Sequence, residues 1–141
     1  MKTVEERNKA LIRRYGEEHY NHWNEALAFE LVHENVRGEF PGFGTSGGIE
    51  NYLQWYRALR NAFPDCHFEI DWMVAEGELV AVRWSYTGTH HGRFMGLPAT
   101  GRRFAMKYNS MYRIVNGKII DIRSETDTLK FFQALGYFSR P

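Results

Sequence analysis

The chain has 141 residues, of which 43% are hydrophobic and 25% charged, and these values suit one globular domain over residues 1–141. The formal net charge is +1 and no Lys/Arg run occurs, so composition gives no support for nucleic acid or an anionic membrane as partner. The single cysteine, Cys66, excludes a disulfide framework and a cysteine-rich zinc site. Without a membrane-length apolar run or a signal-peptide centre, we expect a soluble cytoplasmic protein.

The first half of the chain is typical of helices. Apolar residues recur at helical spacing over residues 4–19, which predicts an amphipathic first helix. Asn24 is placed to cap a short second helix, and a brief extended piece is expected over 36–40. The stretch PGFGTSGG predicts a loop whose Ser46 caps a third helix, and Pro64 ends that helix.

From residue 66 onward the apolar period changes to two, which predicts strands. The first of them would place four residues on one face: Phe68, Ile70, Trp72 and Val74. Longer strands are expected over residues 79–90 and 104–114, and Asn116-Gly117 predicts a tight hairpin to a last strand over 118–125. Asp127 then precedes a short helix that Gly136 closes.

Helices that come first and an antiparallel four-strand meander that comes last predict an α+β fold. We expect a cone-shaped α+β barrel, in which the N-terminal helices pack on a strongly curved antiparallel sheet and enclose a conical cavity. The predicted cavity wall is aromatic and partly polar: Trp84, Tyr86, Met106, Tyr108 and Tyr112. Such a wall suits a flat apolar or aromatic ligand that bears a few oxygens.

The loop over residues 91–101 is longer than a hairpin needs. It keeps Phe94, Met95 and Leu97 among its glycines, although loops are usually polar. These apolar side chains would either cap the mouth of the cavity or pack on a second subunit, and the sequence leaves both alternatives open.

Three stretches, RNAFPDCHFEI, VAVRWSYTGTHHGRFMGLPATGRRF and YRIVNGKIIDIRSETDTLKFFQALG, resemble the SnoaL-like polyketide cyclases. This family belongs to the superfamily built on the cone fold of nuclear transport factor two. The resemblance implies an aspartate acid/base, no metal and no organic cofactor, and ring closure by intramolecular aldol condensation of a polyketide ester. The residue that matches the aspartate is Asp127, and the family pattern also places His90 at the end of its long strand.

The chain departs from the family pattern at three points. Arg123 stands where many relatives carry tryptophan, and Ala99 stands where the loop usually has a second proline. The stretch NVRGEF lacks the histidine that often follows the first short strand. The first and third departures fall on the expected cavity, so they bear on substrate identity.

Asp127 and His90 each have a structural alternative. Asp127 occupies a helix N-cap position, where aspartate is common. A carboxylate held by backbone amides is a poor base near pH 7, so an active Asp127 should face the cavity, where burial raises its pKa. His90 could donate a hydrogen bond to a substrate oxygen, or it could simply bond to a loop carbonyl.

Two further arrangements of polar residues are weaker candidates for a functional site. His19 and His22 are spaced to meet one metal ion, but no third ligand is evident. Arg123 and Glu125 with Asp127 could orient a water, as in epoxide hydrolases on this scaffold. Their spacing is also that of an exposed, salt-bridged strand, which we favour.

The leading hypothesis is a cofactor-independent acid/base enzyme for an apolar, carbonyl-bearing substrate, with Asp127 as acid/base and His90 and Tyr108 orienting substrate oxygens. The alternatives are a non-catalytic binding or assembly domain on the same fold, or an epoxide hydrolase or dehydratase. We also expect a homodimer through the outer face of the sheet, which would carry Met73, Ala81, Ala105 and Met111.

Overall fold

The computed structural model describes residues 1–40 and 44–138, and the side chains of residues 1–39 and 47–138. Part of the loop predicted over 41–48, residues 41–43, lies outside the described residues. Within these ranges the α-helices are α1 (Val4–Arg14), α2 (Ala28–Leu31), α3 (Ile49–Ala62) and α4 (Thr128–Ala134). A π-helical turn, Tyr15–Tyr20, continues α1, and a short 3-10 helix, Glu25–Leu27, leads into α2.

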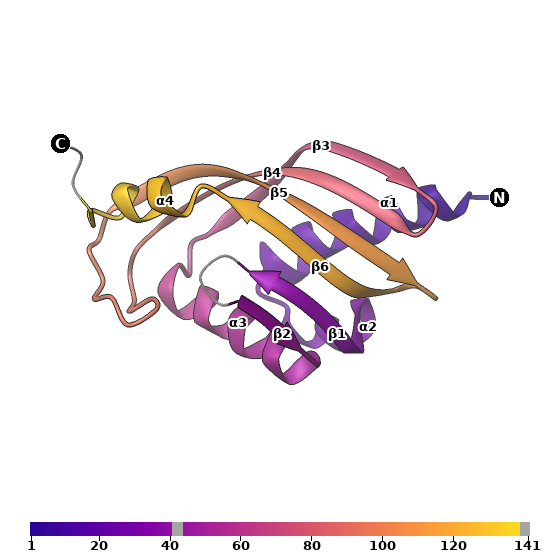
Figure 1. The fold of residues 1–141 in the computed structure, drawn as a ribbon, viewed down its shortest axis with the longest axis horizontal. Helices are drawn as coiled ribbons and strands as arrows, with labels where there is room; N and C mark the ends of the chain where they lie inside the picture. Colours follow the sequence, from indigo (N-terminus) through magenta and orange to yellow (C-terminus); the bar gives the residue numbers. More distant parts are fainter. Residues whose placement is uncertain (41–43, 139–141) are drawn as a thin grey trace.

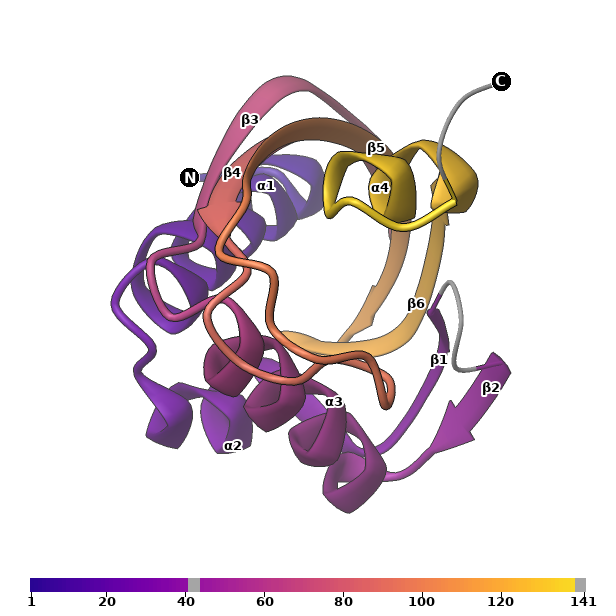
Figure 2. The same cartoon turned by 90° about the vertical axis from the view of Figure 1, so that its left-hand side faces the viewer.

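One sheet of six strands runs through the molecule in the order β2-β1-β6-β5-β4-β3. Its strands are β1 (Val32–Phe40), β2 (Gly44–Gly47), β3 (His67–Glu76), β4 (Leu79–Thr89), β5 (Arg103–Val115) and β6 (Lys118–Thr126). The predicted antiparallel meander β3-β4-β5-β6 is confirmed, and β1 joins β6 in parallel. The sheet curves around α1 and α3, which lie across its concave side (Figures 1 and 2). The predicted α+β cone is therefore confirmed.

Local sequence explains where the helices begin. Thr3 caps α1 by accepting a hydrogen bond from the backbone N–H of Glu6 at 3.1 Å. Glu5 and Glu6 occupy the first turn and Arg13 and Arg14 the last, which suits the helix dipole. The expectation that Ser46 caps α3 is wrong, because residues 44–47 form β2 and Gly48 is the N-cap residue. Gly48 has φ +83°, a conformation that glycine adopts without strain.

A β-bulge in β3 changes which side chains face outward. Ile70 pairs with Trp84 and Trp72 with Arg83, so Asp71 is an extra residue that reverses the alternation. Trp72 is 75% exposed and Val74 is 67% exposed, and both lie on the outer face. Met73 is half-buried against the core. The predictions that Trp72 and Val74 share the face of Phe68, and that Met73 faces outward, are therefore wrong.

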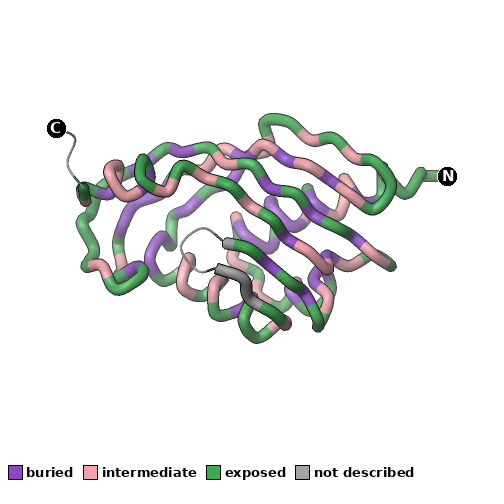
Figure 3. The backbone as a smooth tube through the Cα atoms, in the orientation of Figure 1, coloured by how far each residue is buried: buried purple, intermediate pink, exposed green. Residues whose placement is uncertain are grey.

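Buried residues, purple in Figure 3, lie along the strands of the sheet and along the helices that cover its concave face. Buried residues alternate along β5, from Phe104 to Ile114, with exposed residues between them. α3 contributes Tyr52, Leu53 and Tyr56, all at most 1% exposed, at the spacing of one helical face. Inside the cone the packing leaves a cavity between the sheet, the helices and the loop that joins β4 to β5.

Candidate functional site

A cavity of about 110 Å³ lies inside the cone. Its wall comes from the concave sheet face, the π-helical turn, α3, α4 and the loop between β4 and β5. The lining residues are Tyr15, Gly16, Tyr20, Trp55, Leu59, Phe63, Cys66, Phe68, Trp84, Tyr86, Phe94, Met95, Tyr108, Ser110, Tyr112, Ile122, Ser124, Thr126, Thr128, Phe131 and Phe132. For scale, an engineered cavity of about 150 Å³ binds benzene. The cavity in this conformation therefore holds roughly one ring.

The described lining combines aromatic rings with hydroxyl groups and includes no Asp, Glu, His, Lys or Arg. A buried wall without ionic groups cannot compensate the desolvation of a charged ligand. The hydroxyls of tyrosine, serine and threonine can each donate or accept a hydrogen bond. The wall thus suits a neutral ligand with flat apolar surface and a few oxygens.

Four of the five predicted wall residues line the cavity, namely Trp84, Tyr86, Tyr108 and Tyr112. The indole Nε1 of Trp84 donates a hydrogen bond to the Tyr112 hydroxyl at 3.0 Å, which fixes both rings. Met106 is buried on the same face of β5 but borders the shallow grooves beside α4. Their role as ligand contacts stays a prediction.

A hydrogen-bonded cluster occupies the α1 side of the cavity. His19 lies between the backbone carbonyl of Asn24, 2.8 Å from Nδ1, and the Tyr52 hydroxyl, 2.8 Å from Nε2. The Tyr52 hydroxyl oxygen is 3.0 Å from that of Tyr20 and 3.2 Å from that of Tyr15. Tyr15 and Tyr20 also line the cavity, so the cluster links its wall to a fully buried imidazole.

The π-helical turn brings this cluster together. The backbone N–H of Asn21 bonds to the carbonyl of Gly16 at 3.0 Å, five residues back, as in a π-helix. The wider turn directs Tyr15, His19 and Tyr20 into the interior together. Such turns recur at functional sites.

Burial sets the protonation of these groups. It lowers the pKa of His19 to about 4, against the opposing effect of the Asn24 carbonyl. Burial also raises the pKa of Tyr15 and Tyr52 well above the ordinary phenol value. At neutral pH the cluster therefore consists of a neutral imidazole and protonated phenols.

The loop over residues 91–101 lies at the same end of the molecule as α4 (Figure 2), and its Phe94 and Met95 line the cavity. Within it, Phe94 and Leu97 exchange backbone hydrogen bonds of 3.0 and 2.8 Å across a tight turn. Met95 and Gly96 at the turn have φ +50° and +79°. Phe94 is only 4% exposed and packs against Phe63 with ring centroids 5.0 Å apart.

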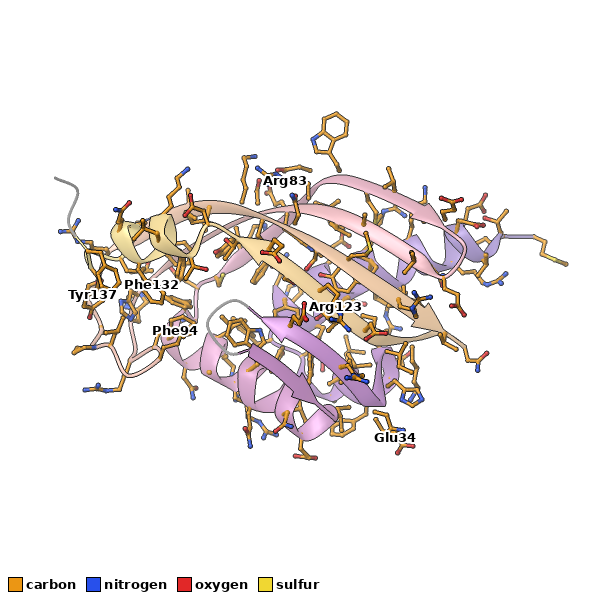
Figure 4. The ribbon with its side chains drawn as sticks, in the orientation of Figure 1. Glu34, Arg83, Phe94, Arg123, Phe132 and Tyr137 are labelled. Atoms are coloured by element: carbon orange, nitrogen blue, oxygen red, sulfur yellow. The ribbon has the colours of Figure 1, made fainter. Side chains whose placement is uncertain are left out.

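Both ends of this loop are fastened. At its start, the backbone N–H groups of His91 and Gly92 bond to the carbonyl of Ala62 at the end of α3, at 2.9 and 3.1 Å. Near its end, the Tyr137 hydroxyl donates to the carbonyl of Pro98 at 2.6 Å. Phe94 and Phe132 lie at the same end of the molecule (Figure 4). Of the two predicted roles, the cavity cap is the one that this chain's own contacts support.

His90 anchors the loop and does not line the cavity in this conformation. Its backbone N–H bonds to the Arg102 carbonyl and its carbonyl accepts from Gly101, both at 2.9 Å. The backbone N–H of Thr100 donates to Nδ1 at 3.3 Å, so the ring proton of the neutral imidazole lies on Nε2. Nε2 is buried without a hydrogen-bond partner among the described residues. The ring packs on Phe63 of the wall, and the role of His90 as a donor to a substrate oxygen stays a prediction.

Asp127 is exposed and caps α4. Its carboxylate accepts a hydrogen bond from the backbone N–H of Lys130 at 2.9 Å, and it borders a shallow outer groove. Thr126 and Thr128, on either side of it, both line the cavity. In this structure Asp127 therefore acts as a helix cap, as the structural alternative expects. To act as a catalyst, its carboxylate would have to turn from the groove toward the cavity.

Arg123 and Glu125 lie outside the cavity. Arg123 pairs with Glu39 at 2.8 Å and with Asp121 at 3.5 Å, on the exposed face of β6 (Figure 4). The prediction of a salt-bridged outer strand is confirmed, and the water-orienting arrangement is not formed. In the described part of the chain, no three His, Cys, Asp or Glu side chains gather as a metal site. Both nitrogens of His19 are engaged within the protein, so it does not pair with His22.

Sequence reasoning missed the cluster around His19. Tyr20 and Tyr52 stood in helical segments whose apolar faces suggested only core packing. The contact between Tyr15 and Tyr20 could not be predicted from α-helical spacing, because residues five apart share a face only in a π-helical turn. The available signal was compositional: three tyrosines and a histidine fall on two helices that both face the sheet.

Comparisons with known proteins agree on one family. The family model for the SnoaL-like polyketide cyclase matches residues 10–135. The chain is 31% identical over 128 residues to aklanonic acid methyl ester cyclase DauD of Streptomyces sp. (strain C5), covering 89% of this chain and 80% of that protein. It is 38% identical over 90 residues to aklanonic acid methyl ester cyclase DnrD of Streptomyces peucetius, covering 63% and 62%.

A structural neighbour supports the fold independently. The crystal structure of a protein assigned to the SnoaL-like polyketide cyclases, from Jannaschia sp. CCS1, superposes with a TM-score of 0.89 at 22% identity. The superposition covers 99% of this chain and 98% of that chain, and at this identity it shows the fold alone. No helix among the described residues is both long and apolar enough to span a membrane. With the family model matching most of its length, the chain belongs to the SnoaL-like polyketide cyclases.

Proposed function

We propose that this protein is a cofactor-independent cyclase that closes a ring by intramolecular aldol addition in a neutral, carbonyl-bearing polyketide ester. The observation that carries the proposal is the cavity itself, with its aromatic and hydroxyl lining. Two relatives that act on aklanonic acid methyl ester, a compound of this class, support the same reaction type.

The reaction is an isomerisation. A base removes a proton from the carbon next to a carbonyl, the resulting enolate carbon forms a bond to a second carbonyl carbon, and the new alkoxide takes up a proton. Atoms balance without a co-reactant. The chain must hold the two carbons close together, exclude water and carry the proton.

Asp127 is the proposed acid/base. In the capped state its carboxylate is engaged with Lys130, so it must exchange that bond for a position beside the cavity. Its neighbours Thr126 and Thr128 already line the wall, so the movement proposed is a reorientation of Asp127 at the first turn of α4.

The remaining residues have supporting parts in the proposal. Tyr86 and Tyr108 face a bound ligand from β4 and β5 and orient its oxygens. Trp84 and Tyr112, fixed by their mutual hydrogen bond, form the rigid wall. His90 supplies its free Nε2–H once the loop moves aside.

The second candidate is a non-catalytic binding domain. It is favoured by one observation: Asp127 is exposed, and its carboxylate accepts a hydrogen bond from the backbone N–H of Lys130. The epoxide hydrolase alternative finds no such support, because Arg123 and Glu125 lie on the outer face.

The test is to incubate the purified protein with aklanonic acid methyl ester and to follow the products by chromatography with mass detection. A new compound of unchanged mass supports a cyclase. Loss of one water without ring closure would indicate a dehydratase, and gain of one water by an epoxide substrate would indicate a hydrolase. Binding without conversion, for this ester and for simpler diketone esters, would contradict the cyclase and favour the binding domain.

A further inference from the structure

The protons of the His19 cluster can be placed by elimination. The carbonyl of Asn24 only accepts hydrogen bonds, so Nδ1, 2.8 Å away, must carry the imidazole proton. The neutral imidazole then has an acceptor at Nε2. The Tyr52 hydroxyl, 2.8 Å from Nε2, must donate its proton there.

The same elimination continues toward the cavity. Tyr52 has one hydroxyl proton, which His19 has taken, so its oxygen only accepts from its other neighbours. Tyr20, 3.0 Å away, donates to it. The Tyr15 hydroxyl donates to the Tyr20 oxygen at 3.4 Å. Its oxygen also lies 3.2 Å from that of Tyr52, whose single proton is already engaged by His19. Every phenol proton in the cluster is therefore engaged by a neighbour within the cluster, and none is left to donate to a ligand.

We propose that Tyr15 and Tyr20 make the α1 side of the cavity a hydrogen-bond acceptor site, which selects a ligand bearing a hydroxyl group, a phenol or an enol, at that position. The inference rests on the proposed function, because the ligand is the substrate of the same cavity. It adds that the substrate presents a donor to the helices, while the hydroxyls of β4, β5 and β6 remain able to donate to its carbonyl oxygens.

The direction of the hydrogen bonds in the cluster is set by His19 and Tyr52, which do not line the cavity. His19 is fully buried and stacks on the ring of Tyr56, with centroids 4.3 Å apart and planes 6° apart. The Tyr56 hydroxyl donates to the backbone carbonyl of His19 at 2.6 Å and does not join the phenol cluster. His19 and Tyr52 are thus positioning residues, and Tyr15 and Tyr20 are the groups that would touch the ligand.

The test uses a matched pair of probes, 2-naphthol and 2-methoxynaphthalene, with binding measured by calorimetry at pH 7. Both are flat and neutral, and only the naphthol can donate. One net hydrogen bond corresponds to roughly a five- to tenfold preference, so the wild type should bind the naphthol more tightly by that factor.

Tyr52→Phe is the informative variant. It removes the acceptor of the Tyr20 proton, so that proton becomes free to point into the cavity. The preference for naphthol should vanish or reverse. Tyr56→Phe is the matched control, a buried tyrosine one turn further along α3, and it should keep the wild-type preference. An unchanged preference in a folded Tyr52→Phe protein would overturn the inference.

A measurement that needs neither a ligand nor a variant tests the inference a second time. Nitrogen NMR of the imidazoles should show His19 as the neutral Nδ1–H tautomer at pH 7, and an Nε2–H tautomer or an imidazolium would overturn the inference. The probes also separate this inference from the proposed function. Binding of both without preference removes the acceptor site alone, whereas failure of both to bind removes the ligand cavity and the inference together.

Discussion

Gly16 lies against the indole ring of Trp84, so closely that a Cβ atom at Gly16 would stand 2.7 Å from Cη2 and 2.8 Å from Cζ3. No larger residue fits there without moving one of the two elements. This contact lets the π-helical turn lie directly on β4. It thereby sets the distance between the His19 cluster and the aromatic wall of the cavity.

Gly16→Ala should therefore destabilise the fold even though alanine is the better helix former. Overpacking costs about 1–3 kcal/mol, which exceeds a helix-propensity gain of at most about 1 kcal/mol. Trp84 cannot easily yield, because it is buried and bonded to Tyr112. The free energy of unfolding in urea measures the loss. Gly47→Ala, where no atom lies within 4 Å of the added methyl, should melt like the parent.

Stability should fall with acid because of His19. Its pKa drops from 6.5 in the unfolded chain to about 4 in the folded one, so the unfolded state binds the proton first. The stabilisation is complete above pH 6.5 and is lost as pH falls toward 4, at about 1.4 kcal/mol per pH unit. Between pH 6.5 and 5 the loss is about 2 kcal/mol.

Urea unfolding at several pH values checks this slope. His19→Gln removes the titration and should flatten the dependence, leaving the smaller contribution of His90, whose pKa burial also lowers. His22→Gln, at an exposed histidine of the same region, should keep the wild-type slope. A parent protein with equal stability at pH 7 and pH 5 would show that His19 is not buried as a neutral group.

The mouth of the cavity should limit ligand entry. A polycyclic ligand exceeds the cavity of about 110 Å³, so Phe94 must swing out before it binds. Phe94→Ala should raise the association rate of hydroxyanthraquinones by roughly tenfold or more, since the opening step is removed. Stopped-flow fluorescence of the tryptophans measures the rate. Leu97→Ala, on the same hairpin but outside the cavity wall, is the control, and equal rates in the two variants would contradict a lid.

Long periodic segments of the sequence were sufficient for most of the fold. The alternation along β4 and β5 and the Asn116-Gly117 turn fixed the meander, because each face of a strand is specified by every second residue. Only the part of β1 over residues 36–40 was predicted, because this strand depends on its pairing with β6, far along the chain. The strand β2 was not predicted, because it has only four residues, two of them glycine. The bulge at Asp71 was not predicted, because the inserted residue leaves the alternation of apolar and polar residue types in the sequence unchanged.

The site was predicted less completely than the fold. The aromatic wall followed from strand periodicity, so Trp84 and Tyr112 could be named in advance. Asp127 illustrates the limit, since a cap and an acid/base require the same residue type and only the direction of the carboxylate separates them. The role of His19 depends on a carbonyl and two hydroxyls from other turns, which no local pattern encodes.

The outer face of the sheet should form a homodimer interface. Trp72 and Val74 are largely exposed, and Val74 lies beside Ala81, which pairs with Met111 of β5. Exposed apolar rows of this kind mark interaction surfaces. Light scattering should give twice the 16.6 kDa mass of one chain. Trp72→Glu should yield monomers, and Phe29→Ser, an exposed aromatic of α2, should not; a monomeric parent would sink the expectation.

The last prediction separates the two roles of Asp127. Asparagine caps a helix about as well as aspartate, so Asp127→Asn should leave the melting temperature nearly unchanged. Alanine cannot accept the hydrogen bond from Lys130, so Asp127→Ala should cost about 1 kcal/mol. Thermal melts of the three proteins at one pH measure this. An alanine variant that melts like the parent would show that the cap contributes nothing to stability.

The catalytic role needs a rate as well as a melt. Asparagine cannot take up and return a proton, so Asp127→Asn should lower turnover of the cyclised ester by roughly 10²–10⁴ while probe binding survives. The matched control is Thr128→Val, which alters the cavity edge beside Asp127 but leaves the carboxylate in place. Because the asparagine variant keeps the cap, a loss of rate cannot be assigned to unfolding of α4. Full activity in a folded Asp127→Asn protein would remove Asp127 from the mechanism and leave helix capping as its role.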